Sequence, residues 1–214
     1  RTVNTDTTNT TATNTAASNT AARGSGKRRV AVVGCGAISQ SHLRYLHASP
    51  LVELVALVDL APVVTGHLAQ MLGPGVRAFD DTAAMLAEVQ PDTVHVLTPP
   101  ASHVPISTLA LRSGADVLCE KPLAATATDV DALLDVAASA GRQVMECQNY
   151  RYLPEMDWMR GIVAGGRLGQ LRQIDVDVRV PIAAGGRFVD DGVPHYVSHL
   201  PGGAVRDFLP HMVY

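Results

Sequence analysis

The chain has 214 residues, which is enough for one large domain or two modest ones. Hydrophobic residues make up 47% of it and aromatic residues 4%, so the sequence can bury a substantial, mainly aliphatic core. A net charge of −3 gives no electrostatic reason to expect nucleic acid or an acidic membrane surface as a partner.

The first 27 residues are rich in Thr, Asn and Ala and show no hydrophobic period, which predicts a disordered leader. No apolar run approaches the length of a membrane span, and this segment lacks the apolar core of a secretory signal. Cys35, Cys119 and Cys147 fit neither a disulfide framework nor a C-x-x-C metal motif. We therefore predict a soluble, cytoplasmic protein with reduced thiols.

Residues 29–39, with the sequence RVAVVGCGAIS, combine a strand, a glycine turn and the start of a helix. Residues 30–33 are consecutively apolar, as in a strand that is buried on both faces. Gly34 and Gly36 end this strand, and backbone N–H groups at such a turn bind a pyrophosphate together with the helix dipole. Ser39 replaces the third glycine of the G-x-G-x-x-G fingerprint. Alone, the motif also fits a glycine-rich turn that binds no nucleotide.

A second apolar strand, residues 52–59, ends in an acidic residue twenty positions after Ser39. In dinucleotide-binding folds, a carboxylate at this place accepts hydrogen bonds from the adenosine ribose hydroxyls. The Asp59 carboxylate would repel a 2′-phosphate, and no Arg or Lys follows it directly, so NAD is favoured and NADP is the second choice. The alternative is a solvated acid or a helix cap before Pro62.

Strand and helix patterns alternate over the whole of residues 28–148. Further strands are expected near 76–79, 93–98, 116–119 and 143–147. Helices are expected at 37–47, 62–72, 102–113 and 126–140, and another one begins at Asp81. This alternation predicts an α/β fold with a doubly wound parallel sheet of the Rossmann type. Ligands of such sheets bind outside the carboxyl ends of the strands. The residues expected together on that rim are Gly34, Asp59, Thr98, Pro99 and Lys121.

The pattern changes after residue 148. A helix near 155–164 is followed by glycine-rich turns and by residues 171–180, where apolar and polar residues alternate as in a half-exposed antiparallel strand. One strand cannot form a second sheet, so residues 149–214 are interpreted as the incomplete start of an α+β substrate domain. The chain also begins with Arg1 instead of Met, and we expect a longer parent protein.

Glu120, Lys121 and Pro122 follow a predicted strand at the expected rim. Proline restricts the backbone of Lys121 to an extended conformation, which fixes the direction of its side chain. A lysine held there could exchange a proton with a substrate hydroxyl oxygen while hydride moves to a nicotinamide. For the tripeptide alone, the plain alternative is a surface lysine.

Asp207 and His211 are four residues apart and would share one face of a helix. Pro210 is tolerated only in a first helical turn, so this helix should begin near Asp207. A histidine in that place, oriented by a carboxylate, suits the removal of a proton from an alcohol. The alternative is an acidic N-cap followed by a surface histidine.

The other histidines carry weaker signals. His42, His47, His67 and His95 are scattered over predicted helices and strands and are interpreted as structural. His195 lies in a Gly/Pro-rich loop close to two aspartates, but the spacing is not diagnostic of a metal site. Substrate contact or solvent exposure is favoured for His195, and no metal is predicted.

Five motifs occur in the order that is typical of one family. They are VAVVGCGAIS at 30–39, LTPPASH at 97–103, EKP at 120–122, NYR at 149–151 and GGAVRD at 202–207 followed by His211. Together they resemble the Gfo/Idh/MocA oxidoreductases, which include glucose–fructose oxidoreductase and inositol dehydrogenase, over about residues 28–214. Two departures are Ser39 in place of a glycine and a second domain far shorter than the family's open sheet.

The resemblance implies roles for individual residues. Lys121 would be the catalytic lysine, His211 the acid/base, and Asp207 its partner or a substrate ligand. With the glycine motif included, the predicted cofactor-binding residues are Gly34, Gly36, Ala37, Ile38, Asp59, Thr98, Pro99, His103, Glu120 and Lys121. Predicted substrate contacts are Asn149 and Arg151 at the domain junction and His195 in the later loop.

The sequence therefore predicts an oxidoreductase that moves hydride between NAD and a secondary hydroxyl or carbonyl of a sugar, cyclitol or related polyol. This substrate class comes from the resemblance. A non-catalytic, dinucleotide-binding regulator of the same fold is the alternative, and a methyltransferase would leave the EKP motif and the Asp/His pair unexplained. The full-length protein is expected to be a homo-oligomer, with no nucleic-acid or membrane partner.

Overall fold

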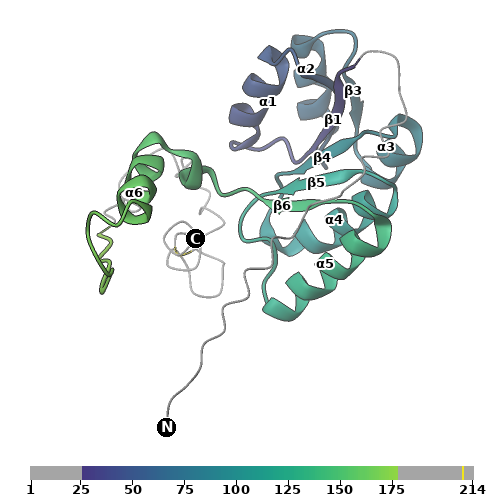
Figure 1. The fold of residues 1–214 in the computed structure, drawn as a ribbon. Helices are drawn as coiled ribbons and strands as arrows, with labels where there is room; N and C mark the ends of the chain where they lie inside the picture. The colour runs from purple at the N-terminus through teal and green to yellow at the C-terminus, as the bar shows by residue number, and fades with distance from the viewer. Residues whose placement is uncertain (1–25, 178–208, 210–214) are drawn as a thin grey trace, which may run out of the picture.

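The structure is a computed structural model that describes residues 26–177 and residue 209 (Figure 1). Six strands form one sheet in the order β3-β2-β1-β4-β5-β6. All neighbouring strands are paired in parallel. The strand order changes direction between β1 and β4, as in a doubly wound dinucleotide-binding sheet, so the predicted α/β fold class is confirmed.

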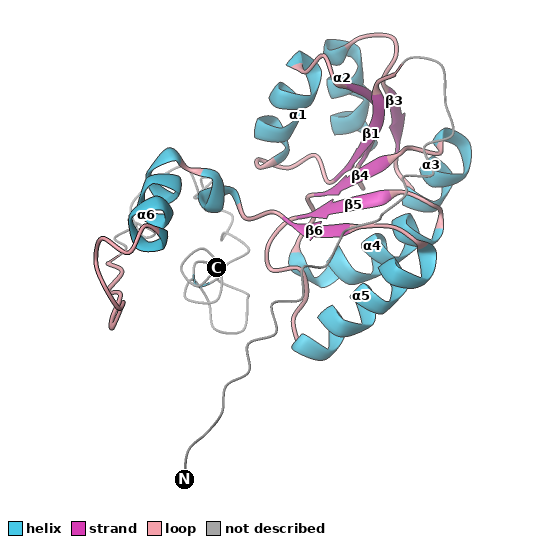
Figure 2. Ribbon diagram, viewed as in Figure 1, coloured by secondary structure: helices cyan, strands magenta, loops and turns pink. Residues whose placement is uncertain are grey.

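The element boundaries lie close to the predicted ones. The strands are β1 (Arg28–Val33), β2 (Val52–Val58), β3 (Arg77–Phe79), β4 (Thr93–Val96), β5 (Asp116–Cys119) and β6 (Val144–Glu146). The helices are α1 (Ser39–Ala48), α2 (Pro62–Leu72), α3 (Thr82–Val89), α4 (His103–Arg112), α5 (Ala127–Ala140) and α6 (Pro154–Ala164), with 3₁₀ turns η1 (Pro100–Ser102) and η2 (Asn149–Tyr152). Figure 2 shows α1 and α2 on one side of the sheet and α3, α4 and α5 on the other.

The central strand β1 is buried on both faces. Val30 and Val32 pack into the hydrophobic cluster that includes side chains of α1 and α2. Ala31 and Val33 pack into the cluster that includes side chains of α3, α4 and α5. None of the four residues is more than 3% exposed, which explains why this strand has a continuous apolar run and no alternation.

Local hydrogen bonds explain where two of the helices begin. The Asp81 carboxylate accepts a hydrogen bond from the Ala84 N–H at 2.7 Å and caps α3. The Thr126 hydroxyl accepts one from the Asp129 N–H at 3.1 Å and caps α5. Each such N-cap typically stabilises a helix by about 1 kcal/mol, so both starts are readable from the sequence.

The strand predicted over residues 171–180 is absent from its described part. Residues 171–177 have no regular secondary structure, and all of them are exposed. A lone strand lacks the neighbour that its backbone hydrogen bonds require, and none pairs with this segment among the described residues. Helix α6 likewise buries none of its residues, and Figure 1 shows it set apart from the sheet.

Some predictions concern residues outside the described ranges. These are the leader over residues 1–25, most of the segment from 178 to 214, and the site candidates His195, Asp207 and His211. None of the described helices is long and apolar enough to cross a bilayer.

Candidate functional site

The carboxyl ends of all six strands meet at one edge of the sheet, because every pairing is parallel. Gly34 follows β1, Asp59 follows β2, and Glu120 follows β5. Thr98 lies two residues beyond β4, and Cys147 comes directly after β6. The described part of the candidate site is therefore built on this carboxyl edge, on both sides of the switch between β1 and β4.

The first glycine of the turn is required by its surroundings. Gly34 has a φ of +96°, and a Cβ added there would lie 2.8 Å from the carbonyl carbon and oxygen of Leu97 and 2.9 Å from the Thr98 nitrogen. No side chain fits between the two loops, which touch backbone to backbone. Gly36 is different, because nothing lies within 4 Å of a Cβ built on it. The space beside Gly36 is where the fingerprint's second glycine lets a pyrophosphate approach.

Ser39 shows how this turn tolerates the loss of the third glycine. It is 1% exposed, and its hydroxyl donates a hydrogen bond to the Gly36 carbonyl at 2.6 Å. Its backbone N–H reaches the same carbonyl at 3.0 Å. No side chain caps the start of α1, and no acidic residue lies in its first turn. The positive end of this helix is thus left uncapped by the protein, as in anion-binding helices.

Asp59 ties the end of β2 to the glycine turn. Its Oδ2 accepts a hydrogen bond from the Cys35 N–H at 2.8 Å, and its Oδ1 accepts one from the Ala61 N–H at 3.0 Å. An ionised carboxylate offers about four lone-pair positions, so both oxygens keep acceptor capacity for another donor. Asp59 therefore has a structural role that does not exclude contact with ribose hydroxyls.

His103 is the first residue of α4 and is fully buried close to the carboxyl edge of the sheet. Its Nε2 is 2.7 Å from the Thr98 carbonyl oxygen, and its Nδ1 is 2.8 Å from the Pro122 carbonyl oxygen. Both ring nitrogens of this side chain therefore face backbone carbonyl oxygens. His103 was predicted to line the cofactor groove; here it connects the loop after β4 to the loop with the cis Lys121–Pro122 peptide bond, and thereby positions both.

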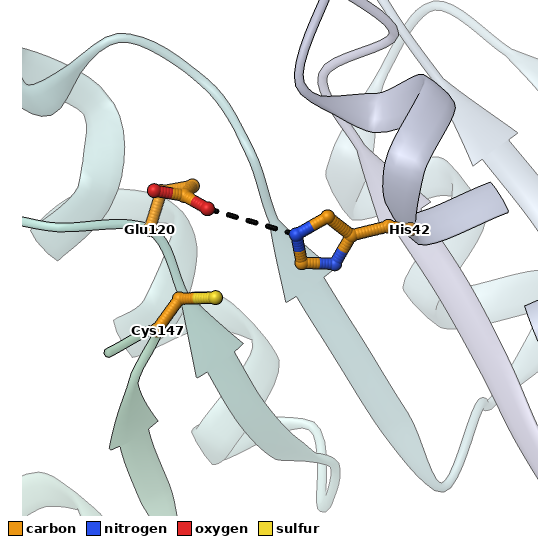
Figure 3. Close-up of side chains that lie close together, drawn as sticks. All are labelled: His42, Glu120 and Cys147. Atoms are coloured by element: carbon orange, nitrogen blue, oxygen red, sulfur yellow. Dashed lines mark ion pairs between the residues drawn. The ribbon is translucent and has the colours of Figure 1, made fainter. Parts of the chain in front are cut away.

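Glu120 is held at the edge by three groups. Its carboxylate accepts a hydrogen bond from the Lys121 N–H at 3.2 Å, and its Oε1 lies 3.6 Å from His42 Nε2 (Figure 3). Burial acts to raise the pKa of Glu120, but the interactions with His42, the Lys121 N–H and the Cys147 thiol outweigh it and place the pKa below its usual range. Glu120 is therefore an anion at neutral pH although it is only 15% exposed.

His42 and His95 form a pair that the sequence did not reveal. Their Nδ1 atoms are 3.1 Å apart, and the rings meet edge to face. Burial, and then the charge of His42, lower the pKa of His95 to about 4. The contact between the two Nδ1 atoms orients the His42 ring so that its Nε2 faces the Glu120 carboxylate, whose lowered pKa is consistent with an N–H at that position. One feature of the sequence could have indicated this pair. The two histidines lie on α1, which follows β1, and on β4, and the switch point lies between β1 and β4.

The lowered pKa of the half-buried His95 makes the stability of the fold depend on pH. The unfolded chain takes up a proton near the ordinary pKa of 6.5, and the folded chain does so near 4, so stability is expected to fall as pH drops through this window. At 1.36 kcal/mol per pKa unit, the loss is at most about 3 kcal/mol. We expect His95→Asn, whose Oδ1 can still accept from His42, to flatten this dependence in urea unfolding between pH 7.5 and 4.5.

The control for that experiment is His67→Gln, since His67 is an exposed histidine on α2. It should keep the wild-type pH dependence. An unchanged dependence in His95→Asn would show that other groups cause it.

The three cysteines are free thiols. Burial, with a smaller contribution from nearby carboxylates, raises the pKa of Cys35, Cys119 and Cys147 to about 12 each. Thiols of this kind are not nucleophiles at neutral pH. The arrangement therefore favours chemistry that uses no covalent thiol intermediate.

The remaining predicted residues lie around this edge or beyond it. Ala37, Ile38 and Pro99 are exposed, and Thr98 is half-buried with its hydroxyl accepting a hydrogen bond from Ser102 at 2.8 Å. Asn149 and Arg151 are exposed on η2, the 3₁₀ turn that follows β6. The structure brings the predicted cofactor residues to one edge, whereas the proposed acid/base pair lies outside the described residues.

Comparison with protein families matches residues 28–148 to the Gfo/Idh/MocA model, which is described as "Oxidoreductase family, NAD-binding Rossmann fold". Rhizopine catabolism protein MocA from Rhizobium meliloti is 30% identical over 177 residues, which cover 78% of this chain and 55% of the relative. D-glucoside 3-dehydrogenase from Escherichia coli (strain K12) is 32% identical over 148 residues, or 69% of this chain and 42% of the relative.

Among solved structures, the WlbA dehydrogenase from Bordetella pertussis, in complex with NADH and UDP-GlcNAcA, has a TM-score of 0.63 at 26% identity. The match covers 67% of this chain and 43% of that chain. The chain spans about half of the length of the curated relatives it matches.

Proposed function

This chain belongs to the Gfo/Idh/MocA family of oxidoreductases, and on that premise we propose that it binds NAD at the carboxyl edge and serves hydride transfer to and from a sugar, cyclitol or related polyol. The observation that carries the proposal is the convergence of the glycine turn, Asp59 and Glu120–Lys121 on one edge. Residues 28–148 would form the nucleotide-binding domain, and residues from 149 onward would begin the substrate domain.

The nucleotide would lie across the switch between β1 and β4. Its pyrophosphate would face Gly36 and the uncapped start of α1. The adenosine ribose would donate hydrogen bonds to Asp59, and Glu120 would contact the nicotinamide ribose. The backbone N–H groups that already hold the Asp59 carboxylate fix its direction, which supports NAD as the preferred cofactor.

We expect Asp59→Ala to lower the affinity for NADH by about 10- to 100-fold and to reduce the preference over NADPH. Hydrogen bonds to a charged group contribute about 1.5–3 kcal/mol, and the loss of the carboxylate also removes its repulsion of a 2′-phosphate. Calorimetric titration with both nucleotides measures the change.

A suitable control is Glu53→Ala, since Glu53 is an exposed carboxylate near the other end of the same strand. This variant should bind both nucleotides as the wild type does. A wild-type preference for NADH in a folded Asp59→Ala variant would contradict the proposed ribose contact.

In the proposed reaction, His211 accepts the proton of the substrate hydroxyl and Asp207 orients its imidazole. Lys121 donates a hydrogen bond to the same oxygen as negative charge develops on it. A bound nicotinamide supplies the hydride acceptor. The family relatives named above support a sugar or polyol substrate, since one of them is a D-glucoside 3-dehydrogenase.

The test of this function is NAD reduction by the full-length protein with a panel of sugars and cyclitols, beside an NADH titration. Turnover on at least one polyol together with NADH binding is the expected result. Tight binding with no turnover on any of them would favour the alternative, a non-catalytic dinucleotide-binding regulator.

A further inference from the structure

Three side chains that commonly bind metals meet at the carboxyl edge. They are the imidazole of His42 on α1, the carboxylate of Glu120 after β5 and the thiol of Cys147 after β6. One ligand atom from each lies within 4.8 Å of the other two, and all three residues are half-buried. Figure 3 shows these side chains directed toward one another from three separate elements.

The spacing of these atoms suits a bound cation better than a direct contact. The 3.6 Å between His42 Nε2 and Glu120 Oε1 exceeds the usual hydrogen-bond range of about 2.7–3.2 Å. Nitrogen and oxygen ligands at about 2.0–2.1 Å from a tetrahedral metal lie roughly 3.3 Å apart. A closure of a few tenths of an ångström would therefore place both atoms in a metal's coordination sphere, while the Cys147 thiol, which lies within 4.8 Å of both, would approach by up to roughly 1 Å.

The imidazole of His42 is already oriented for coordination. Its Nδ1 lies 3.1 Å from His95 Nδ1, which holds the ring with Nε2 facing Glu120; a proton on Nε2 would leave when a metal binds there. A metal-binding histidine usually donates its other N–H to an acceptor in this way. His42 and Glu120 are 13% and 15% exposed, so little side-chain ordering remains to be done when an ion binds.

A second carboxylate adds negative charge beside these ligands. Glu146 precedes Cys147 in the chain, and its Oε1 accepts a hydrogen bond from the Leu123 N–H at 2.6 Å. Its other oxygen accepts one from the Gln148 side chain. Glu146 is thus fixed in place, where its negative charge would stabilise a cation close to Cys147 without being a ligand.

We propose that His42, Glu120 and Cys147 bind one Zn²⁺ ion and leave a fourth position open to water or a ligand oxygen. A nitrogen, oxygen and sulfur donor set favours Zn²⁺ over Mg²⁺ or Ca²⁺, and three protein ligands with an open position are typical of exchangeable zinc sites. The Cys147 thiol binds as thiolate and releases its proton to solvent. Glu120 is also the proposed contact of the nicotinamide ribose, so the metal is tested without nucleotide, and the failure of this site and that of the proposed function are distinguishable.

The probe is Co²⁺, titrated into the 214-residue chain without nucleotide and then displaced by Zn²⁺. We expect a thiolate-to-cobalt absorption band in the near ultraviolet that saturates at one equivalent and disappears when Zn²⁺ is added. Cys147→Ser should abolish this band, and His42→Gln should weaken Zn²⁺ binding at least 10-fold. Cys35→Ala and His67→Gln, which change a thiol and an imidazole outside the cluster, should bind as the wild type does.

Circular dichroism establishes whether each variant is folded. If Cys147→Ser does not fold, the Zn²⁺ affinity of His42→Gln alone tests the proposal. No thiolate band in the wild type, or the same Zn²⁺ affinity in His42→Gln and His67→Gln, would overturn the proposal. A band that persists in folded Cys147→Ser would do so as well.

Discussion

Replacing Gly34 by alanine is expected to lower the free energy of unfolding by about 2–5 kcal/mol, whereas alanine at Gly36 should leave the fold stable and weaken nucleotide binding. At Gly34 the positive φ costs a side chain roughly 1–2 kcal/mol, and the overlap with the Leu97 and Thr98 backbone adds about 1–3 kcal/mol. Typical domains are stable by only about 5–15 kcal/mol, so this is a large fraction.

Gly36→Ala is the matched control, since the same methyl group is added two residues away. It meets nothing within 4 Å in the protein, but it would occupy the place proposed for the pyrophosphate. We expect its urea midpoint to stay near that of the wild type while its affinity for NADH falls at least about 10-fold. Equal stability of the two variants would contradict the close backbone contact between the loops.

Lys121→Ala is expected to lower turnover by about 10²–10⁴-fold in the full-length protein while NADH binding is kept. The reason is that the proposed lysine acts chemically on the substrate oxygen, whereas its predicted contact with the cofactor is one of several that hold the nucleotide. Lys27 and Lys121 are the two lysines of this chain, and Lys27 is exposed just before β1, near the opposite edge of the sheet. Lys27→Ala therefore removes the same kind of side chain far from the proposed site. This control variant should have the wild-type turnover rate.

Steady-state rates with the best substrate from the polyol panel, measured with an NADH titration of each variant, provide the test. Turnover of Lys121→Ala close to that of Lys27→Ala would refute the catalytic role of Lys121. Loss of NADH binding together with turnover would mean that Lys121 acts on the nucleotide, which also contradicts the proposed role.

Local sequence signals were sufficient for most of the sheet and its helices. The apolar run in β1, the caps Asp81 and Thr126, and the proline at the start of α2 each specify an element through contacts within a few residues. Parallel pairing then brings Gly34 and Asp59 to one edge, so this part of the candidate site was predictable from strand order alone.

Contacts between distant segments were not predictable in this way. Which face of α1 turns toward the end of β5 depends on how the helix packs, so His42 was interpreted as structural although it lies against Glu120. The His42–Glu120–Cys147 cluster joins three elements whose side-chain directions no local period specifies, so the sequence did not reveal it. The strand prediction is wrong over residues 171–177 for a related reason. Alternating apolar and polar residues permit a strand, but a neighbouring strand must pair with the segment for it to form.

The central claim is that the carboxyl edge of this sheet binds NAD. The most direct measurement is a ¹⁵N–¹H correlation spectrum of the chain during an NADH titration. We predict saturable shifts for the backbone N–H groups of the glycine turn, the start of α1, Asp59 and Lys121, and none for Asp92 and Asp116, which lie at or near the amino ends of β4 and β5. A spectrum without shifts, or shifts confined to the amino edge, would contradict it.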